Sequence, residues 1–90
     1  MTDSELLSML KVDLGISTAA YDERLAQYIT SAKEQITREG VTLADSVDDA
    51  QLVVMYAAWT WRRRDTGEGM PRMLRYALNN RILSEKMKNG

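Results

Sequence analysis

The densest charge in the chain is a run of three arginines, Arg62, Arg63 and Arg64. Guanidinium groups bind phosphate oxygens, so the run could hold a nucleic-acid backbone. Adjacent residues of a helix point in different directions, however, and cations also stabilise the carbonyl end of a helix. We favour this structural role, because nucleic-acid-binding domains are usually basic overall and this chain has a net charge of −1.

Two tryptophans, Trp59 and Trp61, precede the arginines and could stack on nucleic-acid bases or on a ligand. They lie two residues apart in an apolar segment, which places them on opposite faces of a helix. Packing is the more ordinary role of such side chains. We therefore expect Trp61 to pack in the core and Trp59 to lie on an outer face that contacts another subunit.

Catalytic and metal-binding chemistry has little support in the residue types present. Asp45, Asp48 and Asp49 could bind a divalent cation, but they lack the glycine and the distal glutamate of a calcium loop. Helix capping explains them better. The chain has no histidine and no cysteine, the residues that supply most general bases, zinc ligands and thiol nucleophiles. The sequence predicts a protein that is not an enzyme and needs no metal or cofactor.

A basic strip near the C-terminus is the strongest candidate for a partner surface. No acidic residue occurs between Met70 and Ser84, whereas a solvated face usually mixes both signs. Arginine, tyrosine and apolar side chains together are typical of interface anchors. The predicted partner-binding residues are Arg72, Arg75, Tyr76, Asn79, Asn80, Arg81 and Leu83. A merely solvated basic face is the alternative.

The elements that carry these residues are helices. Apolar periodicity, capping residues and glycines predict one all-α domain over residues 1–90, with helices at 4–14, 19–39, 46–64 and 71–87. The connector at 65–70 contains two glycines and little to pack, so we expect it to be mobile in the free protein and ordered on assembly. In the last helix the expected core positions are Met73, Leu74, Ala77, Leu78 and Ile82.

The third predicted helix is apolar on two faces. One stripe contains Ala50, Val53, Val54, Ala57 and Trp61, and a second lies on the far side. Such a helix either sits centrally or joins a subunit interface. We assign the second stripe, with two neighbouring arginines, to a subunit interface formed by Leu52, Met55, Tyr56, Trp59, Arg62 and Arg63.

Charge is divided unevenly along the chain. Residues 1–50 hold four basic and ten acidic residues, and residues 51–90 hold eight basic and three acidic ones. This asymmetry suggests an electrostatic partner, which could be nucleic acid, another protein or a second copy of the chain. The first ten residues are acidic where a secretory signal would be basic, and the longest apolar run, 52–59, is short of the ~20 residues of a membrane span. We therefore expect a soluble protein that does not bind a membrane.

The order and spacing of several segments resemble a known family. The opening DSELLSMLKVDLGISTAAYDERLAQYITSAKEQI contains a K-x-DLGI turn followed by a YDxxLxxYIxxAKxxI helix. Together with EGVTLADSVDDAQLVVMYAAWTWRRRD and MPRMLRYALNNRILSEK, it is similar to the head–tail connector, or adaptor, proteins of tailed phages and prophages. The likeness covers residues 4–86, and MPRMLRYALNNRI is its most specific part.

This resemblance implies a structural role in the virion neck, with assembly in the host cytoplasm. Family members form a homo-oligomeric ring, commonly a dodecamer, beneath the portal protein after DNA packaging. The ring seats a stopper or tail-completion protein, DNA passes through it, and no cofactor is needed. Two alternatives stay open: a helical nucleic-acid-binding regulator that uses its basic last helix, and a small adaptor outside phages. Salt-dependent binding to duplex DNA would identify the regulator.

Overall fold

A computed structural model describes residues 1–89 of the chain, and over this range the chain is all-α. The helices are α1 (Asp3–Leu14), α2 (Asp22–Arg38), α3 (Val47–Thr66) and α4 (Arg72–Asn89). No strand occurs within residues 1–89, which confirms the predicted fold class. The predicted bounds agree to within three residues. The largest difference is the start of α2, where Tyr21 precedes the helix and no side chain caps it.

Capping residues and a glycine fix the ends of α1 and the start of α3. Thr2 caps α1, its hydroxyl oxygen accepting a hydrogen bond from Glu5 N–H at 3.1 Å. Gly15 ends α1 with a left-handed φ of 71°, a conformation that glycine adopts without strain. Ser46 caps α3 by accepting from Asp49 N–H at 3.2 Å.

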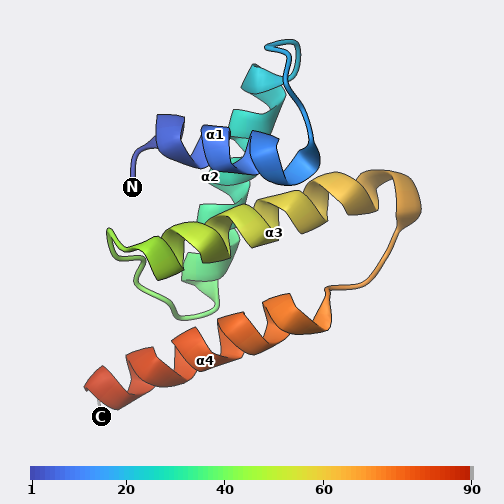
Figure 1. The fold of residues 1–90 in the computed structure, drawn as a ribbon. Helices are drawn as coiled ribbons and strands as arrows, with labels where there is room; N and C mark the ends of the chain where they lie inside the picture. Colours follow the sequence, from blue (N-terminus) through green and yellow to red (C-terminus); the bar gives the residue numbers. More distant parts are fainter. Residues whose placement is uncertain (90) are drawn as a thin grey trace.

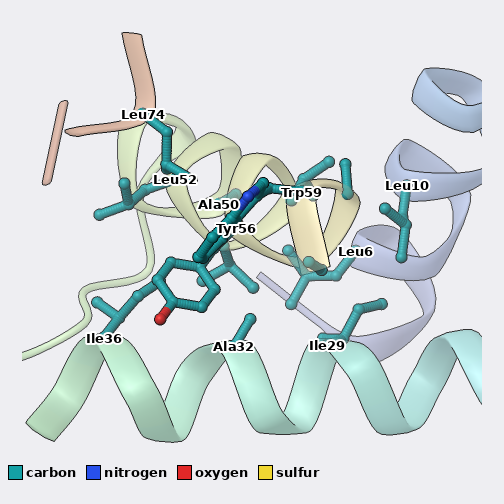
Figure 2. Packing of buried hydrophobic residues seen from close by; sticks show 14 of the residues in the cluster. Leu6, Leu10, Ile29, Ala32, Ile36, Ala50, Leu52, Tyr56, Trp59 and Leu74 are labelled. Atoms are coloured by element: carbon teal, nitrogen blue, oxygen red, sulfur yellow. The ribbon is translucent and has the colours of Figure 1, made fainter. Parts of the chain in front are cut away.

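Helix α3 lies at the centre and the other helices pack around it. Figure 1 shows α1 and α4 on opposite sides of α3, with α2 crossing behind it and α4 running antiparallel to α3. Figure 2 shows Leu6 and Leu10 from α1, Ile29 and Ile36 from α2, and Leu74 from α4 directed toward α3. Its central place explains why α3 is apolar on two faces.

This central position makes one part of the predicted interface wrong. Leu52, Tyr56 and Trp59 were expected on an outer face, but all three are buried inside the single chain. Trp59 packs edge-to-face against Tyr56 at 5.4 Å between ring centroids, and its indole N–H donates to the carbonyl of Glu68 at 3.3 Å. Trp61 is buried as expected. Both tryptophans are therefore core residues.

The connector after α3 is more anchored than the sequence suggested. Helix α3 continues to Thr66 and ends at Gly67, whose φ is 67°. Glu68 then receives the indole hydrogen bond of Trp59, and Met70 packs against the core. Residues 65–69 are exposed, so the connector has little to pack against before Met70, and its mobility stays a prediction.

One core position of α4 is also corrected. Leu74 and Leu78 are buried, and Ala77 and Ile82 are half-buried, but Met73 is 72% exposed. Met73 lies one residue before Leu74 and therefore about 100° away around the helix, so its side chain points away from α3.

Within residues 1–89, the chain has no helix with the length and hydropathy required to span a bilayer.

Candidate interaction surface

Arg81 holds α4 against the rest of the molecule. Its Nε donates to Asp49 Oδ1 at 2.9 Å, and its Nη2 donates to the carbonyl of Thr42 at 2.7 Å. The Arg81 side chain is only 16% exposed. Its predicted place on the partner surface is therefore wrong, because its guanidinium group is occupied within the chain.

Two buried carboxylates complete this anchor. Asp49 also accepts from Ala44 N–H at 2.7 Å, and Glu85 accepts from Thr42 N–H at 2.6 Å. Burial alone would raise the pKa of Asp49, but hydrogen bonds from Arg81 and Ala44 outweigh it and hold that pKa below its usual value. The pKa of Glu85 is lowered as well, chiefly by its hydrogen bonds to Thr42. Both groups are thus stabilised as anions.

The opposite side of α4 carries apolar side chains that nothing in residues 1–89 covers. Met73, Tyr76, Leu83 and Met87 are 72%, 56%, 57% and 73% exposed. With exposed Asn80 they follow a three-four-three-four spacing, so they share one face of the helix. We call this set the α4 stripe. It lies roughly opposite the face formed by Leu74, Leu78, Arg81 and Glu85.

Basic side chains flank the α4 stripe. Arg72, Arg75 and Lys86 are exposed along one border, together with the neutral amide of Asn79. Arg75 forms an ion pair with Glu39 at 3.5 Å, which ties it to the end of α2. Of the predicted partner-binding residues, the structure brings Arg72, Tyr76, Asn79, Asn80 and Leu83 together on one exposed side of α4. Arg75 lies at its margin and Arg81 is removed from it.

The three adjacent arginines diverge, as expected from their spacing. Arg62 Nη2 donates to the carbonyl of Asp13 at 3.1 Å, Arg63 lies 4.5 Å from the Trp59 ring centroid, and Arg64 lies 3.8 Å from that of Trp61. Such cation–π contacts stabilise the fold. Of the predicted subunit-interface residues, Arg62 and Arg63 are exposed and Met55 is half-buried. These three retain side-chain surface for an external contact.

A shallow basic groove lies between α2 and the C-terminal half of α3. Its volume is about 980 Å³, and it is lined by polar, aromatic and basic residues that include Arg24, Tyr28, Trp59, Arg63 and Arg64. The described residues that line this groove include no acid. Its chemistry suits an anionic ligand, although the tryptophans under Arg63 and Arg64 also give these arginines a structural role.

An apolar and acidic face lies between α1 and the start of α3. Two adjoining hollows of about 370 and 210 Å³ share Met9 in their lining. We call this surface the α1–α3 face, and its main side chains are Met9, Val12, Val47 and Met55 with the acids Glu5, Asp13 and Asp45. Val12 is 80% exposed and Val47 is 71% exposed. Asp45 pairs with the amino group of Met1, whereas Glu5 and Asp13 remain exposed at the rim.

Sequence reasoning missed two features of these surfaces. The anchoring role of Asp49 and Glu85 depends on contacts across 32 and 43 residues of sequence, respectively, which no local pattern indicates. Met73 belongs to the α4 stripe, and its heptad spacing with Asn80 and Met87 was present in the sequence. Met73 was assigned to the core because apolar residues on two faces of a helix give no sign of which face is buried.

Among the described residues, histidine, cysteine, aspartate and glutamate form no group of three or more that could hold a metal ion. No protein-family model, curated protein or solved structure matches the chain.

Proposed function

We propose that this chain is a structural subunit of a tailed-phage neck. In this role it forms a ring that docks on the portal after DNA packaging and joins head to tail. The proposal begins from the resemblance of residues 4–86 to head–tail connector proteins. It assigns the chain no catalytic step, cofactor or sequence-specific contact with DNA.

The α4 stripe is the observation that carries the proposal. Four large apolar side chains on one helix face are more than half exposed, and a row of basic residues borders them. An apolar centre with a polar rim is the usual anatomy of a protein–protein contact. A small protein gains little from exposing such a face unless a partner covers it. Assembly with portal, tail protein or neighbouring copies would provide that cover.

Disrupting the gene in its phage or prophage tests this function. The expected lysate contains DNA-filled heads and free tails that have not joined, counted by electron microscopy, and plaque titre falls. Supplying the chain from a plasmid should restore titre. A Met73→Asp/Leu83→Asp variant should not restore it, whereas Ala26→Asp/Thr30→Asp on the exposed side of α2 should. Normal titre from the disrupted genome would contradict the proposal.

The groove between α2 and α3 favours a second candidate, a nucleic-acid-binding module. Its arginines and aromatic rings could contact phosphates and bases. Binding should then weaken steeply with salt, because each neutralised phosphate releases a counterion. Fluorescence anisotropy with labelled short duplex and single-stranded DNA at two salt concentrations distinguishes the two functions. Salt-sensitive binding that is lost in Arg24→Glu/Arg63→Glu would favour the module over the neck subunit.

A further inference from the structure

The heptad spacing of the α4 stripe points to a helix-sized partner surface. Positions 73, 76, 80, 83 and 87 keep to one side of α4, which at 18 residues is about 27 Å long. Helices with this repeat usually pack the stripe against other helices. Within the chain, α3 already occupies the opposite side of α4 through Leu74 and Leu78. No segment within residues 1–89 covers the stripe, which leaves it free for another molecule.

Charge opposes the pairing of one α4 with another. The exposed charged side chains of α4 are basic: Arg72, Arg75, Lys86 and Lys88. The one acid of α4 within the described residues, Glu85, is buried and points to Thr42. Glu39 pairs with Arg75, but no acid among the described residues pairs with Arg72 or Lys86. Two α4 helices packed stripe to stripe would therefore bring these like charges together, which disfavours that contact.

The α1–α3 face has the complementary chemistry. It offers apolar side chains from Met9, Val12 and Val47 beside the exposed carboxylates of Glu5 and Asp13. Neither lysine nor arginine occurs among the described residues that line its two hollows. The ammonium group of Met1, which lines one hollow, is paired with Asp45, and Arg62 contacts only the backbone carbonyl of Asp13. When the α4 stripe contacts the α1–α3 face, the apolar side chains of both surfaces can be buried against each other. The basic residues beside the stripe can then form ion pairs with the acidic residues beside the face.

We propose that the α4 stripe of one copy docks on the α1–α3 face of the next copy, head to tail. The inference rests on the proposed neck function and specifies the contact that builds its ring. Figure 1 shows why the contact repeats: α1 and α4 lie on opposite sides of α3, so each copy keeps a free surface of each kind after the first contact forms. A heterologous contact of this type closes into a ring when its rotation divides the circle.

Two blocked variants test the contact directly. Met73→Asp/Leu83→Asp places charge on the α4 stripe, and Val12→Asp/Val47→Asp places it on the α1–α3 face; all four side chains are more than half exposed, so both variants should fold. Circular dichroism melts verify folding, and Ala26→Asp/Thr30→Asp is the matched control. Sedimentation velocity is measured up to about millimolar protein, because one helix on a shallow face binds weakly.

The expected pattern is specific to a head-to-tail contact. Wild type and control form concentration-dependent oligomers, each blocked variant alone stays monomeric, and an equal mixture forms a 1:1 dimer that grows no further. The dimer stops because its two remaining surfaces are both blocked. Oligomers of Val12→Asp/Val47→Asp alone would overturn the inference by showing that α4 pairs with itself. A wild type that stays monomeric throughout would also overturn it, whereas the neck function is judged separately by unjoined heads and tails.

Two charge-reversal variants provide an independent test that leaves the apolar side chains of both surfaces unchanged. Lys86→Glu alters the basic border and Asp13→Lys alters the acidic rim, both at exposed positions. Each variant alone should assemble less than wild type, and their mixture should recover, because either pairing then joins opposite signs. Higher salt should reduce assembly of the wild type more than that of the single variants. Equal assembly by all the forms would contradict a charge-directed contact.

Discussion

At the scale of single residues, a polar anchor fixes the position of α4. Arg81 spans Asp49 on α3 and the carbonyl of Thr42, while Glu85 accepts from Thr42 N–H. Asp49 is 2% exposed, so its negative charge depends on partners supplied by the fold. Because Arg81 is bound within the chain, the basic border of the α4 stripe is formed by Arg72, Arg75 and Lys86.

Replacing Arg81 by methionine should destabilise the protein. The buried carboxylate of Asp49 would lose its cationic partner and keep only its hydrogen bond from Ala44 N–H, which should cost about 2 kcal/mol. Urea denaturation measures the free energy of unfolding, with exposed Arg72→Met as the control. The double variant Asp49→Asn/Arg81→Met should recover part of the loss, since it removes the buried charge of Asp49 while Glu85 keeps its hydrogen bond from Thr42 N–H. A change below about 0.5 kcal/mol in the single variant would contradict this role.

The same anchor should make stability sensitive to acid. The folded pKa values of Asp49 and Glu85 lie below their ordinary values, so their contribution is complete above the unfolded pKa of about 4 and is lost as pH falls through the folded pKa. The urea midpoint should therefore be nearly constant from about pH 5 to 8 and fall below about pH 4.

Two amide variants separate the anchor from the surface acids. Asp49→Asn should flatten the acid-induced fall in the urea midpoint, because one of the titrating groups is gone. Asp3, whose pKa is lowered by a hydrogen bond from Lys33, has a side chain that is 83% exposed, so Asp3→Asn should change the slope little. Equal slopes for Asp49→Asn and wild type would show that Asp49 does not contribute.

At the scale of elements, α3 organises the fold because both of its apolar faces are covered. Tyr21 and Tyr28 pack edge-to-face on Trp61, and Tyr56 packs on Trp59. The two tryptophans lie on different sides of α3 and are each less than 10% exposed. Helix α4 is also apolar on two faces, but α3 covers just one of them.

Alanine at either tryptophan should therefore weaken the monomer itself. Trp59→Ala and Trp61→Ala each remove a large buried ring and should cost about 3–5 kcal/mol, a large part of the total stability of a small domain. Tyr76→Ala on the α4 stripe should change stability by less than about 0.5 kcal/mol. Thermal and urea melts compare the three variants. If Trp59→Ala were as stable as wild type, Trp59 would not be a core residue, and the outer-face assignment would be supported.

Helix positions and types were predictable because capping residues, glycines and apolar periodicity act locally. Ser46, Gly15 and the stripe of α2 illustrate this. The buried side of a two-faced helix was not predictable, since periodicity records that α3 and α4 each have two apolar faces but not which face meets another helix. Contacts such as Arg81 with Asp49 join residues 32 apart and require the folded topology.

At the scale of the whole molecule, the helices form a thin slab of 45 × 28 × 17 Å. A slab of this size has a small interior relative to its surface, so it cannot bury every apolar side chain that its helices carry. The most exposed ones are concentrated on the α4 stripe and the α1–α3 face, and the helices α4 and α1 lie on opposite sides of α3. This distribution gives a single copy two separate contact surfaces.

The attachment of α4 has a consequence for how stability is distributed along the chain. Helix α4 contributes Leu74, Leu78 and a polar anchor to the interior, whereas α1, α2 and α3 share most of the buried side chains. Its backbone amides should exchange with deuterated solvent by α4 detaching as a unit, at lower free energy than global unfolding. Amides at the middle of α3, near Val53 and Ala57, should exchange slowest. Mass spectrometry of exchanged peptides should show the amides of α4 exchanging together as one cooperative unit. Their protection from exchange should increase when a partner covers the α4 stripe.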